Sequence, residues 1–245
     1  MKWEAYLDLY ERYFSKFRGK NVTMLEIGVQ SGGSIKMWQS YFGPKLNFIG
    51  FDINAYCKRF EGENVRILTG SQLSRADLDD LRENIGHVDI ILDDGGHTFE
   101  MQRNTFEALF STVNDGGYYT VEDIEFSYTR ELGLRTFVDY AKDLIDVLNM
   151  FYYKKKHVPS APHFNEKLAL SINGIHFHDN MIVFEKLERK KPILQIRGTV
   201  MMDEQGKYLT RPAEVEFNDA QHQPISQRDK ELRKARKSEG YIWNT

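Results

Sequence analysis

Short apolar runs alternate with amphipathic segments over most of the chain. The runs are rich in Val, Ile, Leu and Phe, which is typical of buried strands. The segments between them carry apolar residues three and four positions apart, which predicts helices that bury one face. We expect strands at 22–27, 47–51, 65–68, 88–94 and 118–121, and helices at 3–17, 34–42, 75–84, 98–112 and 135–151.

The pattern changes after residue 166, where two apolar runs follow each other with no helix between them. We expect strands at 168–172 and 181–187 to form an antiparallel pair that finishes the sheet. The connecting residues contain His176 and His178, which lack the further ligands of a zinc site. We expect these two histidines to contact substrate or to pack within the hairpin.

Strands that alternate with helices predict an α/β fold with a mostly parallel sheet, an antiparallel last strand and helices on both faces. We expect one domain at 1–190 and a C-terminal extension at 191–245, whose mixed-charge stretch at 228–237 is interpreted as an exposed or oligomer-contacting helix. The first helix, 3–17, has an aromatic stripe. It is expected to cover the sheet or a partner subunit, with a cover over the active site as the alternative.

Composition narrows the class of protein. The chain has 245 residues, of which 41% are hydrophobic. Its net charge of −3 disfavours sequence-independent binding to nucleic acid, which relies on a basic surface. No apolar run reaches the length of a membrane span, and no leader pattern opens the chain. A single cysteine, Cys57, excludes an internal disulfide. We expect a cytoplasmic protein.

Residues 24–34, M-L-E-I-G-V-Q-S-G-G-S, lead from the first strand through a glycine turn into a helix. This arrangement lets a cofactor approach the backbone at Gly28. Glu26 favours a ligand that carries an amine or another cation over one that carries a pyrophosphate. Ser34 is the expected N-cap of the helix.

Two further strand ends suit the rest of such a cofactor. Asp52 ends the second strand about 20 residues after the glycine turn and could accept hydrogen bonds from ribose hydroxyls. It could also cap the following turn. At the end of the third strand Gln72 could flank an adenine, whereas turn or cap roles are equally expected for Ser71 and Ser74.

Carboxylates follow the fourth and fifth strands. Asp93 and Asp94 precede Gly95, Gly96 and His97, and the fifth strand ends in Glu122 and Asp123. Parallel strand ends meet at one edge of a sheet, so these acids should converge and require a cation among them. Mg²⁺ prefers oxygen ligands, and the predicted ligands are Asp94, Glu122 and Asp123.

His97 lies three residues from a predicted metal ligand. A cation lowers the pKa of an oxygen bound to it, and an imidazole nearby can accept the proton at neutral pH. The alternative is a structural histidine that caps a helix. We predict that His97 is a general base that works beside Asp94.

These motifs resemble a known family. L-E-I-G-V-Q-S-G-G-S and Asp52 are similar to class I S-adenosylmethionine-dependent methyltransferases. D-D-G-G-H-T and the later V-E-D-I resemble the metal-dependent sugar O-methyltransferases of the mycinamicin and macrocin group, which usually has Ser at the position of Gly96. The final N-G-I-H-F-H-D-N-M-I-V-F-E-K is also similar to that group. The resemblance covers residues 20–188.

The resemblance implies a Rossmann-like sheet and an enzyme that transfers a methyl group to a sugar hydroxyl. It implies S-adenosylmethionine and Mg²⁺ as cofactors and a glycoside or sugar as acceptor, with no nucleic acid or membrane partner, and we expect a homo-oligomer. The implied metal ligands are Asp94, Glu122 and Asp123, with His97 as base. The predicted cofactor contacts are Glu26, Gly28, Ser34, Asp52, Ser71, Gln72 and Asp93.

Several alternatives remain at this stage. A catechol-type phenol also offers neighbouring oxygens to a metal, and cephalosporin hydroxylase shares part of the glycine motif. A nicotinamide-dependent oxidoreductase is disfavoured because the full G-x-G-x-x-G order is missing. A non-catalytic cofactor-binding subunit would not require His97. Lys154–Lys156 could contact a phosphate, although a solvated charge run is the simpler interpretation.

Overall fold

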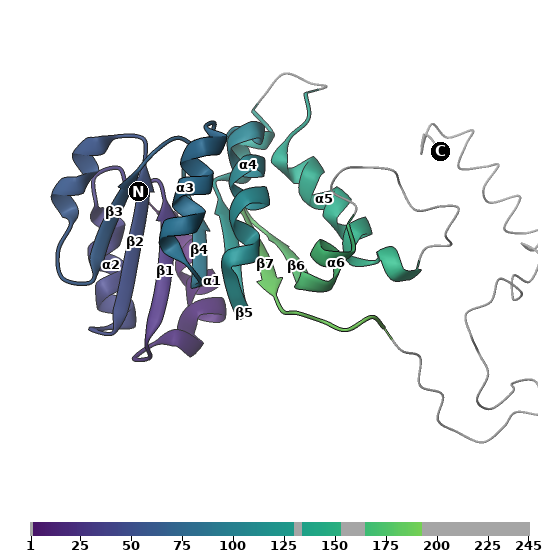
Figure 1. The fold of residues 1–245 in the computed structure, drawn as a ribbon, viewed down its shortest axis with the longest axis horizontal. Coiled ribbons are helices and arrows are strands. Elements are labelled where there is room, and N and C mark those ends of the chain that lie inside the picture. Colours follow the sequence, from purple (N-terminus) through teal and green to yellow (C-terminus); the bar gives the residue numbers. More distant parts are fainter. Residues whose placement is uncertain (1, 130–133, 153–164, 193–245) are drawn as a thin grey trace, which may run out of the picture. The chain divides into compact units, whose positions relative to one another are not determined.

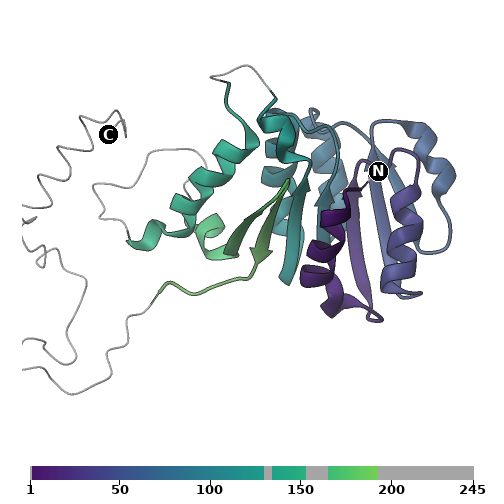
Figure 2. The same cartoon turned by 180° about the vertical axis from the view of Figure 1, so that it is seen from behind.

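The computed structural model describes residues 2–129, 134–152 and 165–192 of the chain. These residues form one central sheet with helices on both faces (Figures 1 and 2). The strand order is β3-β2-β1-β4-β5-β7-β6. The strands are β1 (Val22–Ile27), β2 (Leu46–Asp52), β3 (Val65–Thr69), β4 (Val88–Asp93), β5 (Val113–Glu122), β6 (Ile172–His178) and β7 (Met181–Lys186).

The order of the strands reverses next to β1. The chain runs from β1 outward to β2 and β3, and then returns to place β4 on the other side of β1. All of these neighbours are parallel, as is the β4–β5 pair. In such sheets the connections on the two sides of the reversal diverge, which leaves a crevice beyond the carboxyl ends of the strands.

The last two strands close the sheet in antiparallel fashion. β7 lies between β5 and β6 and is antiparallel to both. Asp179 and Asn180 connect β6 to β7, and Asn180 has a φ of 58°. Asn tolerates this left-handed conformation better than most residues. The predicted α/β fold, mostly parallel with an antiparallel last strand, is confirmed.

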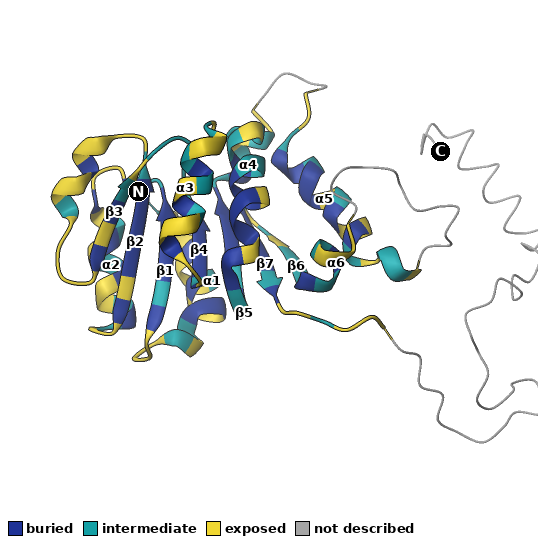
Figure 3. Cartoon of the chain, in the orientation of Figure 1, coloured by how far each residue is buried: buried dark blue, intermediate teal, exposed yellow. Residues whose placement is uncertain are grey.

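Two helical layers cover the sheet. α1 and α2 pack on one face, whereas α3, α4, α5 and α6 pack on the other. Successive strand residues serve opposite faces, so Met24 packs with the first layer and Leu25 with the second. Figure 3 shows the resulting buried strands. The helices are α1 (Glu4–Phe14), α2 (Gly33–Phe42), α3 (Arg75–Ile85), α4 (Phe99–Leu109), α5 (Phe137–Leu148) and α6 (Glu166–Ser171).

Aromatic packing attaches α1 to the sheet. The Tyr10 ring centroid lies 4.8 Å from that of Trp38 on α2 and 5.7 Å from that of Phe14. Tyr6 and Tyr10 are both buried. The aromatic stripe predicted to cover the sheet does so. The same anchoring directs the first turn of α1 toward the carboxyl ends of the strands.

Two predictions for the strands were wrong. Residues 168–172 were expected to be a strand, but most of them form α6, and β6 runs through the residues assigned to the connection. The run is short, and an apolar run of this length does not distinguish a strand from a buried helix turn. The fifth strand was expected at 118–121, but β5 already begins at Val113 and includes Gly116 and Gly117, where its register with β4 shifts.

The predicted domain boundary, after residue 190, lies two residues before the last described residue, and the rest of the predicted C-terminal extension lies outside the described residues, so both stay predictions. Lys154–Lys156 also lie outside the described residues. Within the described ranges, none of the helices combines the length and the apolar character needed to span a membrane.

We predict that Phe106→Ala on α4 destabilises the protein by roughly 3–5 kcal/mol, as is typical of a buried aromatic truncation. The Phe106 ring centroid lies 4.7 Å from that of Phe184 and 5.2 Å from that of Tyr119, so both rings would border a cavity. Chemical denaturation measures the change. The control is Phe177→Ala, because Phe177 is 41% exposed. Equal losses in the two variants would contradict the assigned core.

Candidate active site

The glycine turn after β1 brings two strand ends into contact. Gly28 has a φ of 89°, and its N–H donates to the Phe51 carbonyl over 2.8 Å. A Cβ at this position would lie 2.1 Å from the Asp94 carbonyl oxygen. Any side chain would therefore separate the loops after β1 and β4. Only glycine allows this close approach of the backbones.

The Asp52 carboxylate orders the same turn. Its Oδ2 accepts hydrogen bonds from the Val29 and Gln30 amides, each over 2.9 Å, and its Oδ1 accepts one from the Asn54 amide over 2.8 Å. Asp52 thus caps the local turns, as one interpretation expected. The carboxylate is only partly buried, and Oδ1 accepts just one of these three hydrogen bonds, so the ribose contact stays a prediction.

Ser34 is not the N-cap of α2. The helix begins at Gly33, and its N-cap is Gly32. Gly32 has a φ of 73°, a left-handed conformation that residues with a β-carbon rarely adopt. The Ser34 hydroxyl instead donates to Glu26 Oε2 over 2.7 Å. The glycine pair starts the helix one residue early, and this frees the serine side chain to hold the buried carboxylate.

Gln72 and Asp93 form a buried network beneath the loop after β4. Gln72 donates to Asp93 Oδ1 over 3.0 Å and accepts from the Gly96 amide over 2.8 Å. Tyr119 donates to Asp93 Oδ2 over 2.9 Å. Burial raises the pKa of Asp93 to about 7, although the hydrogen bonds from Tyr119 and Gln72 act in the opposite direction. Both side chains support the loop that carries Asp94 and His97. Ser71 Oγ accepts from the Leu73 amide within the turn after β3.

Three carboxylates from adjacent strand ends surround the ammonium group of Lys2. Its Nζ lies 2.6 Å from Glu122 Oε2, 2.8 Å from Asp94 Oδ2 and 3.4 Å from Glu26 Oε1. Burial raises the pKa of Glu122 to about 7, with the Lys2 charge opposing the shift. Tyr10 on α1 donates a hydrogen bond to the other oxygen of Glu122.

Asp123 begins the loop after β5 and points to a different neighbourhood. Its φ of 55° turns the chain sharply, which directs Asp123 away from Glu122. Oδ1 accepts a hydrogen bond from the Tyr6 hydroxyl over 2.6 Å, and Oδ2 lies 3.8 Å from His97 Nε2. The His97 ring stacks on Phe126 with a centroid distance of 4.9 Å. The imidazole is therefore held between an aromatic face and a carboxylate.

One group in the described part of the chain has the spacing of a metal site. Asp94, His97 and Asp123 each offer an atom, and these atoms lie within 4.8 Å of one another. Two of the three predicted ligands, Asp94 and Asp123, belong to this group. The third predicted ligand, Glu122, instead accepts hydrogen bonds from Lys2 and Tyr10. The ligand set and the role of each predicted site residue stay predictions.

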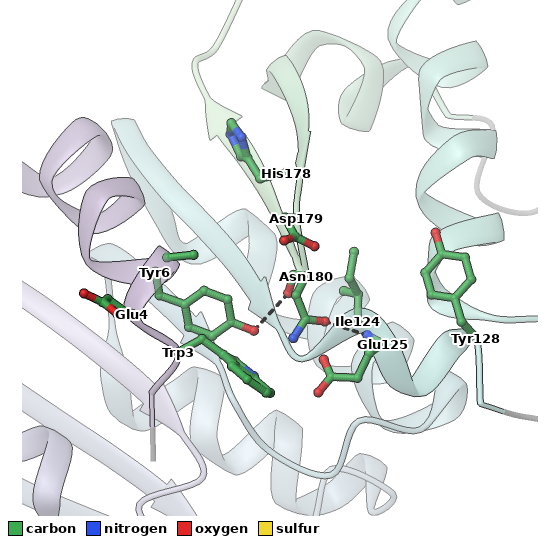
Figure 4. A pocket seen from close by; sticks show the side chains of 10 residues that line it. Trp3, Glu4, Tyr6, Ile124, Glu125, Tyr128, His178, Asp179 and Asn180 are labelled. Atoms are coloured by element: carbon green, nitrogen blue, oxygen red, sulfur yellow. Dashed lines mark hydrogen bonds between the residues drawn. The ribbon is translucent and has the colours of Figure 1, made fainter.

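A pocket of about 760 Å³ opens beside Asp123. It lies between the start of α1, the 3₁₀ turn Ile124–Ser127 and the β6–β7 connection (Figure 4). Its wall carries both aromatic rings and carboxylates, and its described lining contains neither Lys nor Arg. The lining residues are Trp3, Glu4, Ala5, Tyr6, Ile124, Glu125, Tyr128, His178, Asp179 and Asn180.

The sequence analysis missed the part that α1 plays at the site. Tyr6 and Tyr10 reach the predicted metal ligands from a helix that was expected mainly to cover the sheet, and Lys2 reaches them from just before that helix. The aromatic spacing identified the helix. We call Glu26, Asp94, Glu122 and Asp123 the acidic cluster. The tyrosines whose hydroxyls contact this cluster are selected by how the helix packs on the sheet, and no local sequence pattern encodes that packing.

Comparisons with known proteins place this chain among methyltransferases. It is 34% identical over 200 residues to the 8-demethyl-8-alpha-L-rhamnosyl tetracenomycin-C 2'-O-methyltransferase of Streptomyces olivaceus, covering 76% of this chain and 51% of that protein. It is 31% identical over 193 residues to the mycinamicin VI 2''-O-methyltransferase of Micromonospora griseorubida, covering 72% and 47%. The chain thus spans about half the length of these relatives. No protein-family model matches.

Solved structures of methyltransferases are also similar to this chain. The MycE methyltransferase from the mycinamycin biosynthetic pathway, in complex with Mg and SAH, superposes with a TM-score of 0.65 at 30% identity. The match covers 74% of this chain and 49% of that one. The same protein has also been solved with mycinamycin VI bound, and that structure superposes with a TM-score of 0.66. The fold is therefore the Rossmann-like fold of class I methyltransferases.

We predict that Asp93→Asn removes one component of the pH dependence of stability. The folded-state pKa, about 7, lies above the ordinary value of 3.8. This group therefore stabilises the fold fully below about pH 4, and its contribution is lost as the pH rises to about 7. Over that window the wild type should lose up to about 1.4 kcal/mol per pH unit relative to the variant.

Urea unfolding of both proteins at a series of pH values measures this difference. Asparagine retains the shape and the acceptor oxygen for Gln72, and its amide can donate to Tyr119, but it cannot titrate. Curves for wild type and variant that run parallel between about pH 4 and about pH 7 would contradict the assignment.

Proposed function

The chain is a homologue of the sugar O-methyltransferases of natural-product biosynthesis, and we propose that it transfers the methyl group of S-adenosylmethionine to a hydroxyl of a sugar or glycosylated small molecule. The relatives act at hydroxyl groups of glycosides, as their names state. Because the chain spans about half of their length, the activity of the whole protein is part of the proposal.

The observation that carries the proposal is the grouping of Asp94, His97 and Asp123 at the carboxyl ends of β4 and β5. This edge of the sheet is where open α/β folds bind their ligands. The glycine turn at Gly28 and the carboxylate of Asp52 lie along the same edge and are suited to a nucleoside. A cofactor there would point toward the Asp94–His97–Asp123 group.

The residues present fit a divalent cation. The Lys2 ammonium already lies among Asp94, Glu122 and Glu26, so this place favours positive charge. Oxygen donors suit Mg²⁺, and we propose Asp94, Glu122 and Asp123 as its ligands. When bound, Mg²⁺ would polarise the acceptor hydroxyl and lower its pKa.

His97 is proposed to take the proton of that hydroxyl. Its Nε2 faces Asp123 Oδ2 at 3.8 Å, and its ring stacks on Phe126, so the imidazole is held in one orientation beside the proposed metal position. When bound, S-adenosylmethionine would supply the methyl group to the deprotonated acceptor oxygen, and the electron pair of its carbon–sulfur bond would remain on sulfur. The cofactor contacts proposed are those of Glu26, Gly28, Ser34, Asp52, Ser71, Gln72 and Asp93.

The pocket beside Asp123 is the proposed acceptor site. Trp3 and Tyr128 offer exposed rings on which the apolar face of a sugar can pack, and Glu4, Glu125 and Asp179 offer acceptors to its hydroxyls. Carboxylates on the described wall disfavour a phosphate group. This charge supports a glycoside over a nucleotide-linked sugar.

A catechol-type acceptor is the alternative within the same chemistry. The proposal also includes a cytoplasmic location, a homo-oligomeric assembly and the division into 1–190 and 191–245. These stand on sequence patterns alone.

We predict metal-dependent methyl transfer to a glycoside. The protein, incubated with labelled S-adenosylmethionine and a panel of glycosides and catechols, should yield a methylated glycoside detectable by mass. Excess chelator should abolish turnover, and added Mg²⁺ should restore it, because the acidic cluster lacks its proposed cation. Full turnover in chelator would refute metal dependence. Methylation of the catechols alone would favour the alternative acceptor.

We predict that His97→Ala lowers kcat by about 10²–10⁴-fold, the usual contribution of a general base. Cofactor affinity should change little, and calorimetry with S-adenosylhomocysteine measures it. His87→Ala is the matched control, because His87 is an exposed histidine at the amino end of β4. A His97→Ala protein with near-normal turnover would exclude this role.

A further inference from the structure

The ammonium group of Lys2 is the positive charge at the centre of the acidic cluster. It contacts carboxylates from three adjacent strand ends, β1, β4 and β5, at 2.6–3.4 Å. Only 12% of the Lys2 side chain is exposed, and the Glu26 and Glu122 side chains are fully buried. The contact therefore joins the beginning of the chain to residues 26, 94 and 122.

The cluster requires this charge. The Lys2 Nζ lies within 3.4 Å of carboxylate oxygens of Glu122, Glu26 and Asp94, and an ammonium group at this position offsets their negative charge. Buried carboxylates that lose their partner are strongly destabilised. Glu26 Oε1 makes no hydrogen bond and has Lys2 as its near cation, at 3.4 Å. This fully buried oxygen points to a place built for a cation.

Lys2 can leave without unfolding α1. It precedes the first helical residue, Glu4, and the N-cap Trp3 makes no side-chain cap and is 60% exposed. The helix is instead anchored further along by the buried Tyr6 and Tyr10. A long, flexible lysine side chain can withdraw by rotation of its own bonds and of the residues before the helix.

We propose that Lys2 is an internal counter-cation that occupies the acidic cluster while ligands are absent and must leave when a cationic ligand group binds. This inference rests on the proposed function. Two such groups would arrive at the cluster, namely a divalent metal ion and the α-ammonium group of the cofactor. Each would neutralise the carboxylates that Lys2 neutralises now. Lys2 thus lowers the affinity for its replacement and prevents a ligand-free cluster of unpaired acids.

Binding measurements on Lys2→Met test this competition without turnover. Methionine approximates the length of the lysine stem and lacks the charge. Mn²⁺ binding is followed by electron paramagnetic resonance without cofactor, and S-adenosylhomocysteine binding by calorimetry in chelator. We expect at least one affinity to rise by about 5-fold or more, since removal of a competing state raises apparent affinity. Tighter Mn²⁺ binding assigns the metal position to Lys2, and tighter S-adenosylhomocysteine binding assigns the ammonium position.

Two variants serve as controls. Lys2→Arg retains the charge and should bind both ligands within a few-fold of wild type. Lys20→Met removes an exposed lysine just ahead of β1 and should change neither affinity. Unchanged or weaker binding of both ligands to Lys2→Met overturns the inference. That result leaves the proposed methyl transfer intact, because turnover is not the readout.

The wild-type protein gives an independent test if Lys2→Met does not fold. An amine-acetylating reagent should modify Lys2 more slowly than Lys20 in the ligand-free protein, because Lys2 is buried and charged. Addition of Mn²⁺ or S-adenosylhomocysteine should accelerate modification of Lys2 and leave Lys20 unchanged, as read by peptide mass spectrometry. Protection of Lys2 that persists with both ligands present overturns the inference.

Discussion

Glu26, Asp94 and Glu122 lie at the carboxyl ends of three adjacent strands, and the fold buries two of them completely. Like charges at this distance repel, and water is largely excluded. In the folded chain the Lys2 ammonium offsets this negative charge, and the hydroxyls of Ser34 and Tyr10 donate hydrogen bonds to the carboxylates. The acidic edge of the sheet therefore depends on a positive charge, whichever group supplies it.

The helix α1 connects this requirement to the rest of the molecule. Its aromatic face packs on α2 and the sheet, and this packing sets the height at which its hydroxyls reach the strand ends. Tyr10 contacts Glu122 and Tyr6 contacts Asp123. Helix packing and the geometry of the acidic cluster are consequently coupled, so a change in the aromatic interface would also move the carboxylates.

The same strand ends separate two environments for acids that are neighbours in sequence. Asp93 is buried with Gln72 and Tyr119, whereas Asp94 faces the crevice. Glu122 ends its strand among α1 side chains, and Asp123 turns into a left-handed conformation toward His97. In each pair, the two neighbouring acids thus face different surroundings.

Much of the fold followed from the sequence. The apolar runs located β1 to β4 within a residue or two, because hydrophobic periodicity is a local property of the sequence. The glycine turn and the acids that follow the strands predicted a site at the carboxyl ends of the strands. The prediction was wrong at α6, because a short apolar run has the same pattern in a buried helix turn as in a strand. Only the tertiary structure decided that Lys2, Tyr6 and Tyr10 meet the acids and that Glu122 and Asp123 diverge. These contacts join residues more than 90 positions apart, and their partners are chosen by packing between distant elements rather than by local pattern.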